Sequence, residues 1–118
     1  MIELPWPHSK TFPNAKRRLR WYQYQPHCNQ ARLDGFMIAK GYLAQRIDWR
    51  PSPDCPLPMR VTFYPPDRRH RDDDGMIGAF KHLRDGIADG LGVNDRMFRP
   101  EYHFAEPVKG GLITVELG

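Results

Sequence analysis

Three consecutive aspartates, Asp72, Asp73 and Asp74, are the residues whose type and spacing most clearly permit chemistry. Adjacent carboxylates repel one another unless a cation or nearby arginines neutralise them. If the chain stays extended as far as Asp74, then Asp72 and Asp74 point to one side and Asp73 to the other. Such oxygen ligands suit Mg²⁺ or Mn²⁺. The alternative that remains open is that all three aspartates cap a helix and complement its dipole.

Lys81 follows Asp74 by nearly two helical turns, which returns it to the same side of a helix. Because helical side chains lean toward the N-terminus, this lysine could reach the acidic end. There it could neutralise a phosphate, orient the attacking water or protonate a leaving oxygen. An ion pair with Asp85, one turn further on, is the equally open alternative.

Basic residues precede the aspartates, and the chain has a net charge of +4. Carboxylates that bind a cation within a basic surrounding that binds phosphates are what phosphodiester cleavage requires. The plainer interpretation of each basic group is a solvated charged face. The candidate DNA-contacting residues are Lys16, Arg17, Arg18, Arg20, Arg68, Arg69 and Arg71, and His70 is the one histidine that merits mutation.

A helix from about residue 75 to residue 89 must position these groups, because apolar residues recur at helical spacing from Met76 to Leu91. Gly90 and Gly92 end it. At about 1.5 Å per residue this helix is on the order of 20 Å long, so Asp95 is expected near the end opposite to Asp74. An ordinary turn aspartate is the alternative for Asp95.

This length predicts an assembly. Because of this helix length, a single chain is expected to be unable to bring Asp95 to Asp72 and Asp74. Two copies of the helix are therefore expected to pair antiparallel about a two-fold axis. Asp95 of one protomer would then meet Asp72 and Asp74 of the other, giving a homodimer with two equivalent composite metal sites.

The remaining pattern predicts a single α+β domain over residues 1–118, a small mixed sheet with two helices packed on it in the order β-α-β-α-β-β. Pro5, Pro7 and Pro13 predict that a loop carries the first basic cluster, which consists of Lys16, Arg17, Arg18 and Arg20. The expected elements are strands over 2–4, 59–64, 102–105 and 112–117, a first helix over 29–45, a proline-rich connector over 51–58, and a closing hairpin through the turn at 109–111.

Cysteine use and hydropathy predict the compartment. Cys28 and Cys55 show neither a disulfide framework nor zinc spacing, which predicts reduced thiols in the cytoplasm. The first ten residues lack the features of a signal peptide. No apolar run approaches the roughly 20 residues that cross a bilayer, so no membrane partner is expected.

The stretch RDDDGMIGAFKHLRDGIADGLGVND, from Arg71 to Asp95, resembles the RusA-like endonucleases, Holliday junction resolvases found in phages and prophages. Their pattern is R-D-x-D-N, a helix with lysine and aspartate, and then D-D. The segments from Leu4 to Pro7 and from Pro13 to Arg17, with Trp21, also look like that family. Gly75 and Asn94 depart from it, at the positions of the asparagine and of the first residue of the later aspartate pair.

The resemblance implies a Mg²⁺-dependent endodeoxyribonuclease, with Mn²⁺ as a possible substitute, that nicks four-way or branched DNA in recombination and repair as a homodimer. The setting would be the cytoplasm of a bacterium or of a phage-infected host. Carried over residue by residue, the resemblance makes Asp72, Asp74 and Asp95 the metal ligands and Lys81 the catalytic lysine. Two alternatives stay open: a non-catalytic basic nucleic-acid-binding protein, and a partner of an acidic protein.

Overall fold

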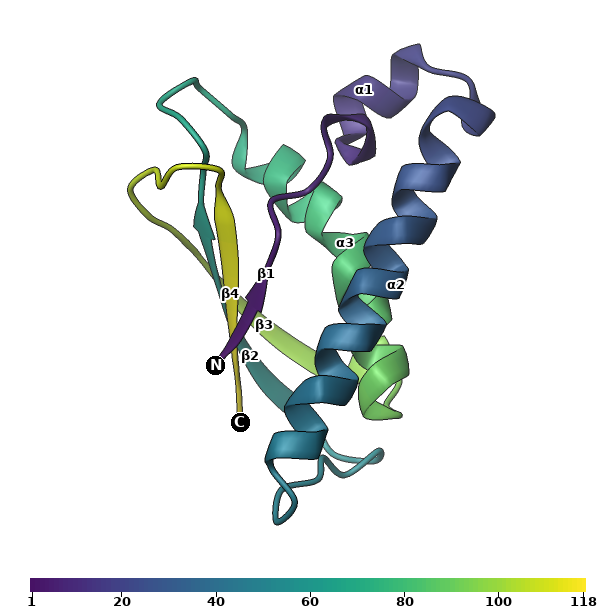
Figure 1. Ribbon diagram of the computed structural model, residues 1–118, viewed down its shortest axis with the longest axis vertical. Helices are drawn as coiled ribbons and strands as arrows, with labels where there is room; N and C mark the ends of the chain where they lie inside the picture. Colours follow the sequence, from purple (N-terminus) through teal and green to yellow (C-terminus); the bar gives the residue numbers. More distant parts are fainter.

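Helices packed on one face of a four-stranded mixed sheet make up the computed structural model, which describes residues 1–118 (Figure 1). The α+β class expected from the sequence is confirmed, with one more helix than expected. In chain order the elements are β1 (Ile2–Leu4), η1 (Ser9–Thr11), α1 (Pro13–Arg18), α2 (Trp21–Gln45), β2 (Leu57–Tyr64), α3 (Asp73–Leu91), η2 (Asp95–Met97), β3 (Phe98–Phe104) and β4 (Leu112–Leu117).

Strand β2 is central, and the sheet order is β1-β4-β2-β3. β2 pairs antiparallel with β4 and parallel with β3, so that Val61 lies between Val115 and Tyr102. The expected hairpin between the last two strands is therefore wrong, because β2 separates them. Parallel neighbours need a crossover connection, and α3 supplies it between β2 and β3.

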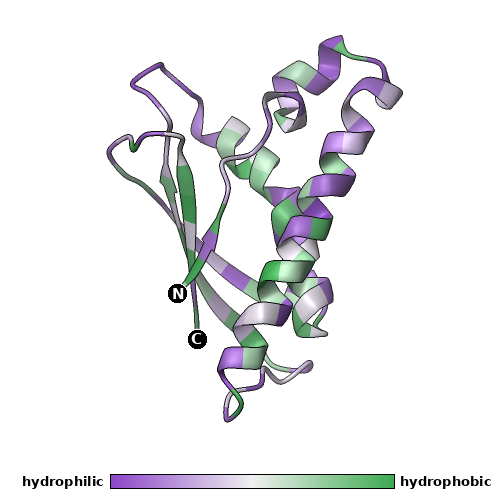
Figure 2. Ribbon diagram, viewed as in Figure 1, coloured by the Kyte–Doolittle hydropathy of each residue, from purple (hydrophilic) through white to green (hydrophobic).

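The core lies between the sheet and the helices, where alternate residues of β2 face α3. In Figure 2 hydrophobic and hydrophilic segments alternate along α3 and the strands, and the loops at the upper end of the sheet are mostly hydrophilic. Phe63 stands edge-on to Phe80 of α3 with ring centroids 6.0 Å apart. The stripe predicted from Met76 to Leu91 is buried as expected, which fixes the side of α3 that remains available for chemistry.

Helix α3 begins at Asp73, two residues earlier than predicted. The extended alternation expected for the three aspartates is therefore wrong: Asp72 is the N-cap, and Asp73 and Asp74 belong to the first turn. Acidic side chains in a first turn are favoured by the helix dipole, which helps to explain why the helix extends this far. Gly92 ends it in the left-handed conformation, with φ 73°.

Lys16, Arg17 and Arg18 of the first basic cluster lie on helix α1, and Arg20 lies in the short link before α2, so the loop predicted for the cluster is wrong for three of its four residues. Pro13 occupies the first turn, where the missing N–H costs nothing because that position has no helical acceptor. Helix α2 likewise begins at Trp21, eight residues earlier than expected, and contains Pro26. A proline in a helix removes one backbone hydrogen bond, and the packing of α2 on α3 outweighs that loss.

Helices α2 and α3 approach closely through glycines. A Cβ atom at Gly90 would lie 2.7 Å from the Phe36 carbonyl oxygen, and one at Gly86 would overlap the backbone of Arg32. We expect Gly86→Ala to lower the free energy of unfolding by about 2 kcal/mol or more, because the two backbones must separate. Thermal and urea unfolding would measure the loss.

Gly41→Ala is the matched control, since Gly41 lies on α2 with nothing within 4 Å of an added Cβ. It should gain up to about 1 kcal/mol from helix propensity. Equal behaviour of the two variants would contradict the close approach of α2 and α3.

Candidate active site

The three aspartates lie at the N-terminal end of α3. Although Asp72 is the N-cap residue, its side chain makes no capping hydrogen bond. Its Oδ1 lies 3.3 Å from Nε2 of His70 instead. Asp73 and Asp74 are exposed and take part in no ion pair or side-chain hydrogen bond. The helix therefore does not occupy these oxygens through capping bonds, and they remain available to a ligand.

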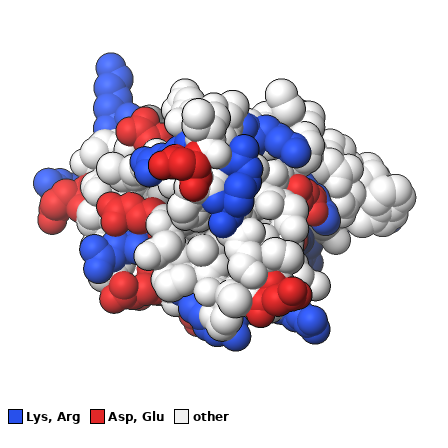
Figure 3. Space-filling model, turned by 90° about the horizontal axis from the view of Figure 1, so that it is seen from below, with Lys and Arg blue, Asp and Glu red and all other residues white.

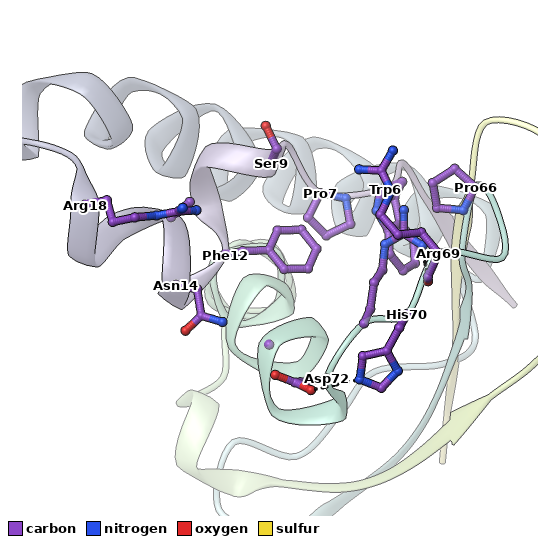
Figure 4. A pocket seen from close by; sticks show the side chains of 13 residues that line it. Trp6, Pro7, Ser9, Phe12, Asn14, Arg18, Pro66, Arg69, His70 and Asp72 are labelled. Carbon is purple, nitrogen blue, oxygen red and sulfur yellow. Dashed lines mark hydrogen bonds and ion pairs between the residues drawn. The ribbon is translucent and has the colours of Figure 1, made fainter.

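A groove runs between α1, the segment 66–72 and the start of α3 (Figure 4). We call it the α1–α3 groove. It consists of two open cavities of about 620 and 670 Å³. Asn14, His70, Arg71, Asp72 and Gly75 line both of them. The first cavity adds Trp6, Phe12, Arg18 and Arg69, and the second adds Arg17, Asp73 and Asp74.

Basic side chains flank the carboxylates in this groove. Arg18 from α1 and Arg69 from the facing loop are exposed and line the first cavity, from opposite sides in Figure 4. Arg17 is exposed and lies 3.3 Å from the side-chain oxygen of Asn14. A phosphate group could approach the aspartates between these arginines, because guanidinium groups bind phosphate oxygens.

Two of the predicted DNA-contacting arginines already have partners. Arg71 is 17% exposed, donates a 2.9 Å hydrogen bond to Asp67 and lies over the ring of Trp6. That hydrogen bond lowers the pKa of Asp67 below its usual value. Arg68 is exposed and pairs with Glu106 at 3.2 Å. Arg71 thus braces the loop beneath the groove, and Arg68 points to the neighbouring β3–β4 connection.

Lys16 braces α1 against its neighbours. Its Nζ lies 3.4 Å from Nε2 of His82 on α3 and 5.2 Å from the ring centroid of Tyr24. Burial, with a smaller contribution from Lys16, lowers the pKa of His82. Of the first basic cluster, Arg17, Arg18 and Arg20 are the exposed cations.

Lys81 pairs with Asp85 at 3.4 Å, which is the alternative that the sequence left open. One seven-residue step brings Lys81 back to within about 20° of Asp74 around the helix. Beside it, Oδ1 of Asp85 and Nε of Arg84 are buried without a hydrogen-bond partner. This side of α3 therefore carries charged groups whose hydrogen-bonding capacity the single chain does not fill.

Asp95 lies beyond the C-terminal end of α3, as expected, in the short helix η2. Its Oδ2 is 3.9 Å from Nη2 of Arg84, and it lines a small cavity with Asp85 and Asp89. Arg32 donates a 2.6 Å hydrogen bond to Asp89, and that bond lowers the pKa of Asp89. The nineteen residues of α3 extend about 28 Å, and within one chain no three Asp, Glu, His or Cys side chains converge as a metal site.

The end of the molecule away from α1 has a different charge pattern. Figure 3 shows it with acidic and basic side chains interspersed and no continuous basic area on that face. Exposed arginines without an ion pair, such as Arg46, Arg96 and Arg99, also occur away from the groove. The groove is therefore distinguished by the position of its arginines beside the aspartates.

Asn14 and Asp67 are site residues that the sequence did not single out. Asn14 lines both cavities, and Asp67 holds Arg71. The four-residue spacing of Asp67 and Arg71 is a readable signal for an ion pair. For Asn14 there is no such signal, because its role depends on α1 folding back over the start of α3.

Comparison with known proteins shows an uncharacterized relative and no matching family. No known family matches the chain. An uncharacterized protein of Xylella fastidiosa, strain Temecula1, is 39% identical over 106 residues, covering 82% of this chain and 61% of the relative. The chain thus spans about three fifths of that relative's length. None of the helices combines the length and hydropathy that crossing a bilayer requires.

Proposed function

We propose that this protein is a RusA-like, metal-dependent endodeoxyribonuclease that nicks four-way or branched DNA in recombination and repair. The observation that carries the proposal is that Asp72 makes no capping bond and lines both adjoining cavities of the groove. The first cavity also contains the unpaired Arg18 and Arg69, and the second contains Asp74 and Arg17. A purely structural acidic N-terminus would not require this arginine-lined approach. The motif from Arg71 to Asp95, with its resemblance to the RusA-like endonucleases, is the other support for the proposal.

Residues at the start of α3 would supply only some of the ligands that a divalent metal ion needs. Asp72 and Asp74 offer hard, exposed oxygens, which suit Mg²⁺ or Mn²⁺, but within one chain no third side chain converges with them as a ligand. Asp95 of a second protomer would complete the set if two α3 helices pair antiparallel.

In the proposed reaction a bound magnesium ion would polarise the scissile phosphate and lower the pKa of a water. The residues of the chain do the rest. Arg18 and Arg69 hold backbone phosphates on either side of the aspartates without reading base sequence. Lys81 leaves Asp85 and stabilises the negative charge that develops on the phosphate, as a preorganised cation does. His70 orients the Asp72 carboxylate.

Affinity for DNA should fall steeply with salt. Four phosphate contacts are expected per protomer, from Arg17, Arg18, Arg20 and Arg69. With four such contacts, raising the salt concentration from 50 to 200 mM should weaken binding about a hundredfold per protomer. Fluorescence anisotropy of a labelled junction would measure it. Arg69→Ala should flatten this dependence. Arg68→Ala, which removes a cation already paired with Glu106, should leave it unchanged, and the reverse order would contradict the groove as the DNA site.

A non-catalytic nucleic-acid-binding protein is the second candidate, and the separation of Asp95 from Asp74 within one chain favours it. The deciding experiment incubates the protein with a synthetic four-way junction and with a linear duplex, each with Mg²⁺ and with EDTA. If the protein is the proposed nuclease, paired nicks should appear in the junction with Mg²⁺ and not with EDTA. The second candidate predicts EDTA-insensitive binding and intact strands, while a partner of acidic proteins predicts no salt-sensitive binding to DNA.

A further inference from the structure

Two large aromatic side chains are exposed at the start of α2. Trp21 is 68% and Tyr22 57% exposed, and their rings are 6.2 Å apart and nearly perpendicular. The other tryptophans, Trp6 and Trp49, are half-buried and pack against the core. Exposed aromatic area of this size is expected to have a binding partner.

The charge around the two rings indicates what that partner is. From Pro5 to Leu33 the chain contains no acidic residue. The exposed Arg17, Arg18 and Arg20 precede the rings, and none of them forms an ion pair. Aromatic faces beside unpaired cations suit a ligand that combines π surfaces with phosphates.

A lipid surface fits less well. The exposed residues that follow the rings on α2 mix polar side chains, such as Gln23, Asn29 and Gln30, with the separated apolar residues Leu33 and Met37. An interfacial helix would place a continuous apolar face there. The observations therefore favour nucleotides.

We propose that Trp21 and Tyr22 stack on unpaired bases of a DNA strand, while Arg17 and Arg20 hold the adjoining phosphates. Bases inside a duplex are already stacked on their neighbours. The surface formed by Arg17, Arg20, Trp21 and Tyr22 therefore selects unpaired nucleotides such as those at a branch point. This inference rests on the proposed function for the choice of DNA as the nucleic acid and for the cleavage site beside the rings.

The position of the rings connects this surface to the groove. Arg18 lines the α1–α3 groove (Figure 4), and Trp21 follows it by three residues, which span at most about 11 Å. A strand that leaves the aspartates past α1 therefore meets Arg20 and then the rings. In this arrangement the rings hold a branch open beside the scissile phosphate.

The test compares a labelled short oligothymidine with a duplex of equal length, for the full chain and for Trp21→Ala and Tyr22→Ala. Each variant should bind the single strand about tenfold more weakly and the duplex within about twofold of the parent, as loss of base stacking predicts. The quenching of tryptophan emission by the single strand should disappear in Trp21→Ala, and Trp21→Phe should restore most of the affinity. Met37→Ala is the control, because Met37 is an equally exposed apolar residue of α2.

Unchanged single-strand affinity in Trp21→Ala, equal weakening in Met37→Ala, or no single-strand binding by the parent protein overturns the inference. Trp21-dependent binding to anionic phospholipid vesicles with unchanged DNA affinity overturns it in favour of a membrane surface. Mg²⁺-dependent nicking of a junction is assayed on the same samples. If binding depends on Trp21 but no nicking occurs, the proposed function is wrong and this inference stands. If nicking occurs but binding does not depend on Trp21, this inference is wrong and the proposed function stands.

Discussion

Asp74→Asn is expected to reduce nicking of branched DNA by about a thousandfold or more, because it removes an anionic ligand at the centre of the proposed metal site. The substitution keeps the size of the side chain, and Asp74 is exposed with no partner in the chain, so the fold should be unaffected. Junction affinity, measured without metal, should stay close to that of the parent protein. Cleavage kinetics and anisotropy titrations on the same preparation separate the two effects.

Asp73→Asn is the matched control, one residue away on the same first turn. It removes the same charge from the helix N-terminus but no proposed ligand, so nicking should persist. If Asp74→Asn loses binding together with cleavage, Asp74 has a structural role. If Asp73→Asn is as inactive as Asp74→Asn, the general negative charge of the helix end matters, and a specific metal ligand does not.

Mixing two inactive variants is expected to restore activity. In an antiparallel dimer with composite sites, a chain with Asp74→Asn still supplies Asp95, and a chain with Asp95→Asn still supplies Asp74. Their heterodimer has one intact site. Random exchange makes half of the dimers mixed, with one of two sites intact, so about a quarter of the parent activity should return.

Mixing Asp72→Asn with Asp74→Asn is the control, because both changes fall on the same half of the composite site. Every site in that mixture lacks one ligand, and nicking should stay absent. Sedimentation equilibrium of each variant verifies that dimers form. Recovery in both mixtures, or in neither, would contradict the exchange of Asp95 between protomers, and a fully active monomer would remove the dimer altogether.

Much of the fold could be predicted from local pattern. The apolar stripe from Met76 to Leu91 predicted α3 and its buried side, and Gly92 marked its end, because only a glycine readily adopts the left-handed cap. The alternation in β2 predicted a half-buried strand. These signals are readable because each reflects the period of one element, at positions close together in the sequence.

Boundaries that depend on distant contacts were predicted less well. Pro13 was expected to keep the chain out of a helix, yet α1 begins at this residue. Helix α2 begins eight residues before its predicted start and continues through Pro26. The close packing of α2 against α3, which Gly86 and Gly90 allow, contributes what the local sequence at Pro26 lacks. A proline penalty of a few kcal/mol is small enough for such packing to overcome.

By itself, the sequence determined which residues could do chemistry: the carboxylates at the start of α3, the arginines that precede them, and Asp95 beyond the helix end. Only the tertiary structure decided which of them share a groove. Folding of α1 over the start of α3 brings Arg18 toward Asp72, the ion pair with Asp67 takes Arg71 out of that role, and the rigid length of α3 separates Asp95 from Asp74 within one chain. The physical reason is that side-chain chemistry is local, whereas convergence on one site depends on how rigid elements pack.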